Sequence, residues 1–365
     1  MAQRPDLSFP QGTELVFGPQ AQRRQYVSDS VAAVMRGWGF CELILPAFDS
    51  PATFGQAEEA AMVQFTDREG RRMALRADFT QIAAKALALE LKREPREIRA
   101  CYEGRVYRYA SSGHGARIES TQRGLEWVNA TGTVFDAATI TIARECLRAL
   151  AVKDAVVVVG HAGFMQEVLG RGILEPNLFE ALDHKNPARI RDLCQRYGLQ
   201  AERAKALEAL PMLTGGPEVI QRARALDLAK FLDDKGAKAL QALSELDELA
   251  QLLAAAGSQE GVIFDLGEVR SFQYYSGFTF RIYHPLLGED LGGGGRYDGL
   301  FDRFKMSVPA VGFGLNLARL AEVTQENPYA ADGAEVIDAS RGSEALKRLA
   351  LLRAQGKSVI LKGGA

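Results

Sequence analysis

The stretch of the chain best suited to binding a ligand is LGGGGRYDGLFDRFKMSVPAVGFGLNLARL, residues 291–320. Its four consecutive glycines, Gly292 to Gly295, let a backbone pass close to a ligand or another strand, because no Cβ stands in the way. An Arg-Tyr-Asp-Gly turn follows, and a strand then leads into a helix that carries Arg319. A glycine cluster alone is weak evidence. Its weight comes from three charged and aromatic segments upstream: ALRADFT (74–80), RVYRYASSGHGARIESTQRGLEWV (105–128) and VRSFQYYSGFTF (269–280).

The elements that must position these segments follow from hydrophobic periodicity and from the places of Gly and Pro. In the first 130 residues the pattern predicts a helix from Pro19 to Gly37, a strand over 40–46, a hairpin over 62–76, a helix over 78–94, and two strands over 97–109 and 122–130. Asp78 or Thr80 would cap the second helix, because either side chain can accept a hydrogen bond from an N-terminal N–H. A long polar loop would join the last two strands.

The composition of the chain changes at about residue 150. A short buried strand is predicted over 155–160, and the pattern over 164–256 is almost wholly helical, which indicates an inserted helical region. Strand character returns over 262–266 and 277–283. After residue 323 only about 40 residues remain, and we expect one helix and one strand over 343–362, too little for a full domain. This order of elements predicts an α+β fold around an antiparallel sheet.

Bulk properties exclude several classes of protein. With 365 residues, of which 47% are hydrophobic, the chain can bury a sizeable core. The formal net charge is −2 and no basic arm or stripe is present, so electrostatics give no support for nucleic-acid binding. No apolar run approaches the roughly 20 residues that cross a membrane, and no N-terminal leader is seen, so we expect a cytoplasmic protein. The four cysteines, which form no C-x-x-C pair, are interpreted as buried or idle thiols.

Together, the four segments resemble the class II aminoacyl-tRNA synthetase core, specifically its histidyl branch, over roughly residues 8 to 323. The resemblance implies a class II synthetase-like antiparallel sheet flanked by helices. The core would span 1–323 with a helical insertion at about 164–256, and 324–365 would form a short C-terminal α/β remnant.

The resemblance also implies a pocket for free histidine. Asp78 matches the acid that holds the substrate ammonium. Arg270 matches the histidine-specific arginine that reaches the carboxylate and the α-phosphate. The complete set of matching positions is Asp78, Thr80, Arg108, Gln122, Glu126, Arg270, Tyr275 and Tyr297.

Each of these residues has a structural alternative. Asp78 could serve only as a helix cap, and Gln122 and Glu126 could face solvent on a strand. Tyr275 and Tyr297 could be core aromatics with a hydrated hydroxyl. What favours a binding site is that the set keeps the order and spacing of the family.

The nucleotide side of the resembling site is altered. Arg108 matches the arginine that holds the α-phosphate, and Arg319 matches the nucleotide clamp of the third motif, so both could remain as a phosphate site. Two acids and at least one base are missing, although Arg117 stands in the loop where bases are expected. The replaced positions are Ala110, Ser111, Ala116, Ile118 and Ala318. Because nucleotidyl chemistry relies on positioned countercharge, these losses argue against adenylation.

One family fits both what is kept and what is lost. The chain resembles the regulatory subunits of the short-form ATP phosphoribosyltransferase, which are catalytically silent paralogues of histidyl-tRNA synthetase. STQRGLEW (120–127), YYSGFTF (274–280) and the short C-terminal segment, in place of an anticodon-binding domain of about a hundred residues, carry this likeness. Ser271 and Gln273 depart from the pattern and put the shape of the histidine pocket in question.

This resemblance implies a regulatory subunit without catalytic residues, cofactor or metal. It would activate a separate catalytic ATP phosphoribosyltransferase subunit in the first step of histidine biosynthesis and transmit feedback inhibition by L-histidine. It would do so as a dimer within a hetero-oligomer, without tRNA and without a membrane. Histidine could instead bind the catalytic partner. The alternatives are a divergent histidyl-tRNA synthetase-like ligase, kept open by Arg108, Arg270 and Arg319, and a scaffold whose pocket is vestigial.

Overall fold

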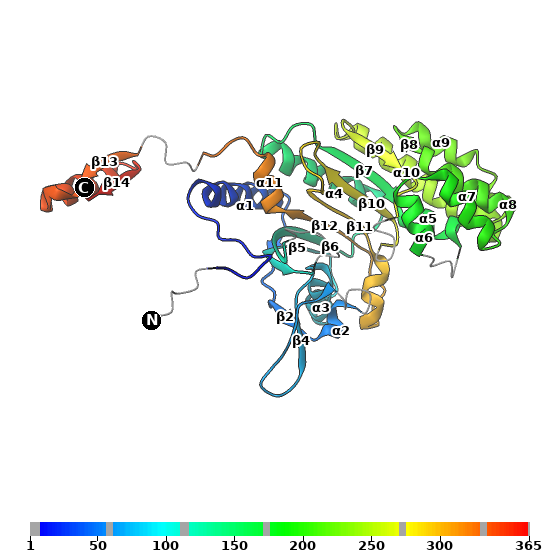
Figure 1. Ribbon diagram of the computed structural model, residues 1–365, viewed down its shortest axis with the longest axis horizontal. Helices are drawn as coiled ribbons and strands as arrows, with labels where there is room; N and C mark the ends of the chain where they lie inside the picture. The colour runs from blue at the N-terminus through cyan, green and yellow to red at the C-terminus, as the bar shows by residue number, and fades with distance from the viewer. Residues whose placement is uncertain are drawn as a thin grey trace, which may run out of the picture. The chain divides into compact units, whose positions relative to one another are not determined.

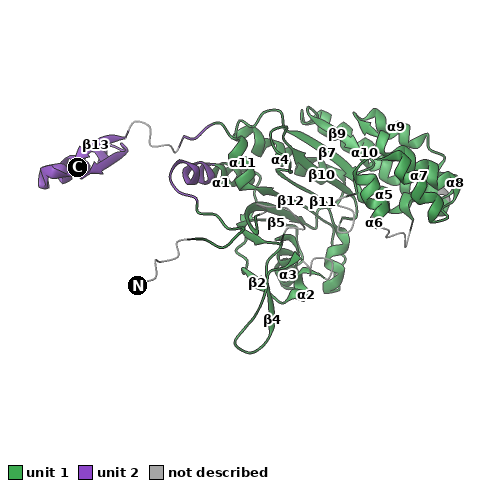
Figure 2. Ribbon diagram, in the orientation of Figure 1, with its two compact units in different colours: residues 1–15, 27–325 green, residues 16–26, 326–365 purple. Residues whose placement is uncertain are grey.

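The structure is a computed structural model and describes residues 8–55, 61–109, 117–170, 176–269, 275–328 and 334–363 (Figure 1). The chain divides into two compact units (Figure 2). Unit 1 comprises Met1–Leu15 and Val27–Gln325, and unit 2 comprises Val16–Tyr26 and Glu326–Ala365. No helix in the described part of the chain is both long enough and apolar enough to cross a bilayer.

A nine-stranded sheet forms the centre of unit 1. In spatial order its strands are β1 (Cys41–Glu42), β5 (Ile98–Tyr107), β6 (Glu119–Val128), β12 (Ala310–Asn316), β11 (Gly292–Arg296), β10 (Phe278–Tyr283), β7 (Val156–His161), β9 (Val262–Asp265) and β8 (Thr214–Gly215). The antiparallel prediction is confirmed from β5 to β7, but the sheet is mixed, because β1–β5 and β7–β9 are parallel pairs. Parallel neighbours need a long crossover, and the helical region supplies it between β7 and β9.

The predicted hairpin is confirmed within a small three-stranded sheet of β2 (Phe48–Asp49), β4 (Arg72–Leu75) and β3 (Gln64–Thr66). Its turn is held by Asp67, whose Oδ1 accepts hydrogen bonds from the backbone of Glu69 and Arg71. The strand predicted over 40–46 is shorter than expected. Beyond Glu42 the carbonyls of Leu45 and Pro46 accept hydrogen bonds from the Arg76 guanidinium instead of extending the ladder.

Helices flank the sheet, and α5 to α9 lie beside β7, β9 and β8 at one end of it (Figure 1). Four of the described helices, α1, α2, α6 and α7, begin at prolines, as expected for a residue whose missing N–H is not needed in the first turn. The α-helices of unit 1 are α1 (Pro19–Gly37, which begins in unit 2), α2 (Pro51–Phe54), α3 (Thr80–Arg93), α4 (Thr133–Ala149), α5 (Ala162–Leu169), α6 (Pro176–Asp183), α7 (Pro187–Arg196), α8 (Ala201–Ala209), α9 (Glu218–Arg224), α10 (Ala237–Ala255) and α11 (Leu317–Val323). Short 3₁₀ turns are η2 (Leu210–Met212), η3 (Leu228–Lys230), η4 (Asp233–Gly236) and η5 (Asp298–Phe304).

Helix α3 carries an apolar face that packs onto the sheet beside the glycine-rich segment. Its buried positions are Ile82, Ala83, Ala84, Leu87, Ala88 and Leu91. Most of them join a core cluster with residues of β5 and η5. Just before the helix, Phe79 stacks on Tyr102 of β5 with ring centroids 4.3 Å apart, and the Arg76 guanidinium lies 4.3 Å from the Phe79 ring centre. The start of α3 is thereby fixed against β5.

Unit 2 contains a helix between two parallel strands: β13 (Glu335–Asp338), η6 (Ala339–Arg341), α12 (Ser343–Ala354) and β14 (Val359–Lys362). The small core is formed by Ile337, Ala345 and Leu352. The predicted helix and the predicted final strand are both present. Strand β13 was not predicted, because four residues with a single buried position give no recognisable alternation.

Candidate functional site

A cavity of about 800 Å³ lies in unit 1 between the start of α3, the strands β5, β6, β10, β11 and β12, and the β10–β11 connection. Gly292, Gly293, Gly294 and Gly314 form part of its wall, where side chains would otherwise fill the space. The glycine run also packs closely against the neighbouring strand β12. A Cβ on Gly294 would collide with the carbonyl oxygen of Gly312. Both predicted uses of the glycines, close strand contact and an open ligand space, therefore occur together.

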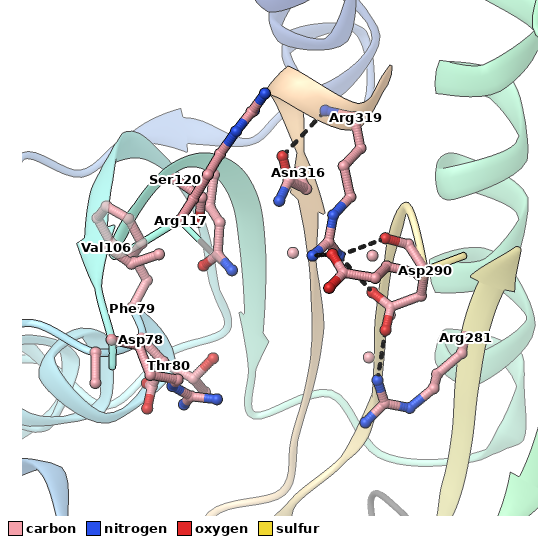
Figure 3. Close-up of a pocket in the computed structure, with 18 of the residues that line it drawn as sticks. Asp78, Phe79, Thr80, Val106, Arg117, Ser120, Arg281, Asp290, Asn316 and Arg319 are labelled. Atoms are coloured by element: carbon pink, nitrogen blue, oxygen red, sulfur yellow. Dashed lines mark hydrogen bonds and ion pairs between the residues drawn. The ribbon is translucent and has the colours of Figure 1, made fainter. Parts of the chain in front are cut away.

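The structure brings most of the predicted residues to this cavity. Those that line it are Asp78, Thr80, Arg108, Gln122, Tyr275 and Arg319. Glu126 and Tyr297 lie just behind its wall, against Gly312. Arg270 lies outside the described residues, as do Ala110, Ser111, Ala116, Ser271 and Gln273. Figure 3 shows Asp78 and Thr80 on one side of the cavity, the acidic wall, and Arg281 and Arg319 on the other, the arginine wall.

Asp78 caps helix α3 and also lines the cavity. Its Oδ1 accepts a hydrogen bond from the backbone N–H of Gln81 at 3.1 Å, which is the action of a helix cap. Its side chain also lines the cavity and lies beside Thr80 (Figure 3). A carboxylate held in this way by the first turn of a helix remains able to bind an ammonium group.

Glu126 is the most deeply buried acid of the site, with 2% exposure, so the solvent-facing alternative is wrong for this residue. The hydroxyl of Tyr102 donates to its Oε1 at 3.0 Å. Among the described residues, its Oε2 has no hydrogen-bond partner. Burial raises the pKa of Glu126 to about 8; the hydroxyls of Thr80 and Tyr102 lower it in part, and the charge of Asp78 raises it further. The carboxyl is therefore largely protonated at neutral pH, and a ligand cation or N–H donor would favour its ionised form.

The two predicted tyrosines differ in their surroundings. Their ring centroids are 6.2 Å apart with the planes tilted by 54°. Tyr275 lines the cavity. Tyr297 is 2% exposed and belongs to the core cluster, so the core-aromatic alternative describes its ring, while its hydroxyl points toward Gly312 and Glu126. Tyr275 therefore offers an aromatic surface to the cavity, while the Tyr297 hydroxyl lies beside the buried carboxyl of Glu126.

The opposite wall of the cavity is rich in arginine. Arg319 donates from Nη1 to the carbonyl oxygen of Asp290 at 2.7 Å and forms an ion pair with Glu289. Arg281 on β10 pairs with Asp290 at 2.8 Å (Figure 3). Arg117 also lines the cavity, with Glu14 at 3.4 Å and Glu322 at 3.6 Å. The arginine wall is thus neutralised by acids of the same chain.

Sequence reasoning missed four residues of the site: Tyr102, Arg281, Glu289 and Asp290. The strand predicted over 277–283 contains Arg281, but the sequence did not show that the side chain of Arg281 faces the cavity. Gly293 makes room for it, since a Cβ there would approach the Arg281 side chain to 3.2 Å. The two acids belong to a connection without a recognisable motif, and only the fold brings them to Arg319.

Known proteins have sequences similar to that of this chain. A family model described as histidyl-tRNA synthetase matches residues 12–320. An ATP phosphoribosyltransferase regulatory subunit from Moorella thermoacetica is 33% identical over 372 residues, which span 100% of this chain and 94% of that relative. The chain belongs to the ATP phosphoribosyltransferase regulatory subunit family.

Solved structures agree with membership of the regulatory subunit family. The crystal structure of an ATP phosphoribosyltransferase regulatory subunit/histidyl-tRNA synthetase from Bacillus halodurans matches with a TM-score of 0.84 and 26% identity, over 99% of this chain and 94% of the other. A histidyl-tRNA synthetase from Nostoc sp. PCC 7120, 20% identical, has the same fold with a TM-score of 0.79 over 99% and 87% of the two chains. The predicted class II synthetase-like fold is confirmed.

Proposed function

We propose that this chain activates a separate catalytic ATP phosphoribosyltransferase subunit and relays feedback inhibition by histidine, without catalysing a reaction itself. The names of its relatives support the regulatory role. The observation that carries the proposal is a cavity whose two walls carry charged groups of different kinds. One wall has Asp78, with the carboxyl of Glu126 buried behind it, as acids for a small cation. On the opposite wall Arg319, which a nucleotide would need, and its neighbour Arg281 are engaged by acids of the chain.

Histidine suits the chemistry of the acidic wall. Asp78 would hold the α-ammonium, and Arg108 or Gln122 would contact the carboxylate. The imidazole would lie against Tyr275 and donate an N–H to Glu126, whose Oε2 lacks a partner among the described residues. A buried carboxyl gains most from such a donor, because an unsatisfied buried oxygen costs about 1–3 kcal/mol. The proposed contacts are Asp78, Thr80, Arg108, Gln122, Glu126, Arg270, Tyr275 and Tyr297.

Regulation requires that histidine bind one arrangement of the complex more tightly than another. A ligand shifts a conformational equilibrium only by its difference in affinity for the two states. By linkage, if the active arrangement of the catalytic partner lowers the affinity of this chain for histidine, histidine disfavours that arrangement by the same factor. The proposal includes a dimer of this chain within the hetero-oligomer and no role for tRNA.

The direct test is co-expression with the short catalytic phosphoribosyltransferase of the same genome. We expect a stable complex whose turnover requires this chain and falls when histidine is added. Asp78→Asn should leave the complex and its activity intact but make turnover less sensitive to histidine. Turnover that is equally sensitive in Asp78→Asn and wild-type complexes would place the histidine site elsewhere. A catalytic subunit that neither binds this chain nor needs it would contradict the regulatory role.

A further inference from the structure

The β10–β11 connection, residues 284–291, forms a strap over the arginine wall of the cavity. Leu287, Gly288, Glu289 and Asp290 all line the cavity. The strap is fixed at Leu291, where it joins β11. The N–H of Leu291 donates to the carbonyl of Ile282 at 2.7 Å, and the carbonyl of Leu291 accepts from the N–H of Asn316 at 2.8 Å. The middle is exposed, with Leu286 at 79%.

The strap places two carboxylates on the two arginines that face the cavity from this side. Asp290 lies between Arg281 and Arg319, with its side chain on the first and its carbonyl oxygen on the second (Figure 3). Glu289 forms an ion pair with Arg319. In geometry this is how two arginines hold a multiply charged anion, with the oxygens supplied by the chain itself.

These contacts are of a kind that an external ligand can displace. The Glu289 side chain is 70% exposed and that of Arg319 is 28% exposed, so water weakens their attraction. Asp290 and Arg281 are less exposed, at 26% and 27%. Away from Leu291, the contacts that join the strap to the arginine wall, among the residues that the structure describes, are these ion pairs and the hydrogen bond from Arg319 to the carbonyl oxygen of Asp290. A pyrophosphate-like anion offers more charge and more acceptor oxygens than two separate carboxylates.

We propose that the strap is an internal competitor for anions: Glu289 and Asp290 occupy Arg281 and Arg319, and a phosphate-bearing ligand reaches these arginines only when the strap lifts. The acids exclude such anions from the cavity at low concentration while leaving the acidic wall, with Asp78 and Gln122, open to a small zwitterion. This device does not depend on the regulatory function, because it concerns the other wall of the cavity.

The test uses the full-length chain and inorganic pyrophosphate as the probe, with binding measured by calorimetry. Removing both strap charges in Glu289→Gln/Asp290→Asn should tighten pyrophosphate binding about tenfold, the combined effect of two partly exposed ion pairs. Adding Arg319→Met to this variant should abolish the gain. The matched control is Asp192→Asn/Glu202→Gln, which removes the same charge from exposed positions on α7 and α8 and should bind pyrophosphate as the wild type does.

A measurement on the wild-type chain provides a second test of the strap. Amide hydrogen exchange over 284–291 should accelerate when pyrophosphate saturates the protein, because the strap must lift for the anion to enter. Equal affinity in wild type and the double strap variant, a gain that survives Arg319→Met, or a gain of the same size in the control would each overturn the proposal. Histidine affinity, measured on the same proteins, should stay within about twofold of the wild-type value. If histidine binds neither the wild type nor any of these variants, that result would count against the proposed function alone.

Discussion

The hydroxyl of Tyr102 lies 3.0 Å from Oε1 of Glu126 and donates a hydrogen bond to it. Tyr102 is itself stacked on Phe79, which carries the Arg76 guanidinium on its ring. The core packing that attaches α3 to β5 therefore also fixes the most deeply buried acid of the site. The position of this carboxyl is therefore set by the packing of α3 on β5 as well as by its own hydrogen bond.

The raised pKa of Glu126 predicts a pH dependence of stability. In the unfolded chain the carboxyl loses its proton near pH 4.5, whereas in the folded chain it keeps it to about pH 8. Between these values the folded state binds more protons, so its stability falls as the pH rises, and the loss is complete above pH 8. Glu126→Gln removes this contribution. Near pH 9 the variant should be more stable than the wild type by a few kcal/mol, because each pH step between the two pKa values contributes about 1.4 kcal/mol. Near pH 5 the two proteins should be similar.

Urea unfolding of both proteins at pH 5, 7 and 9 measures this difference. The comparison of variant with wild type cancels the titration of other groups that the two proteins share. A difference in the free energy of unfolding that does not change with pH would show that Glu126 ionises normally in the folded chain.

Asp78 allows the capping role to be separated from the binding role. Asn caps helices about as well as Asp but carries no charge, whereas Ala neither caps a helix nor carries a charge. Asp78→Asn should therefore keep the melting temperature close to that of the wild type and weaken histidine binding by at least tenfold. Asp78→Ala should lose similar affinity and also about 1 kcal/mol of stability. Calorimetry with histidine and thermal unfolding distinguish these effects; unchanged affinity in both variants would remove the ammonium assignment.

Much of the fold could be predicted from the sequence, because the signals are local. The hydrophobic periodicity of each segment, together with the Gly and Pro residues at its ends, predicts the helix from Pro19 to Gly37, the hairpin and the two long strands. The edges of the sheets are harder. Beyond β1 the carbonyls of Leu45 and Pro46 bind Arg76, about 30 residues away in the sequence, instead of a neighbouring strand, and β13 is a strand because it pairs with β14.

The same division applies to the site. The residues that carry the family's order and spacing were found, and six of them line the cavity. The sequence did not predict the protonation of Glu126 or the pairing of the arginines, since both depend on contacts between segments that are distant in sequence. The pKa of Glu126 follows from its burial behind Gly312, and the neutralisation of Arg319 follows from a turn 30 residues upstream. No pattern within either segment indicates these relationships.

Two glycines of β12 test the shape of the cavity. At Gly314 a Cβ would meet only Gln122 Oε1, at 4.0 Å, so Gly314→Val would project into open space from a strand that favours valine. We expect normal folding and a fall in histidine affinity of more than tenfold. At Gly312 a Cβ would collide with the carbonyl oxygen of Leu125 and with Glu126 Oε2. Gly312→Ala should therefore lose about 1–3 kcal/mol of stability by overpacking.

Calorimetry and urea unfolding of both glycine variants report these outcomes separately. The pair is matched, since both changes add a side chain to the same strand two residues apart. A Gly314→Val protein that folds and binds histidine normally would place the ligand outside this cavity, whatever Gly312→Ala does.

Histidine-dependent exchange between ATP and pyrophosphate distinguishes the regulatory protein from a synthetase-like ligase. The purified chain should show no exchange above background, while an authentic histidyl-tRNA synthetase serves as the positive control. The physical reason is that the arginine that would clamp a nucleotide, Arg319, is bound by Glu289 and Asp290, and Ala318 stands where an acid is needed. Loss of a single positioned group of this kind costs roughly 10²–10³ in rate. Robust exchange would mean that the arginine wall opens and works during turnover, and the chain would then be an enzyme.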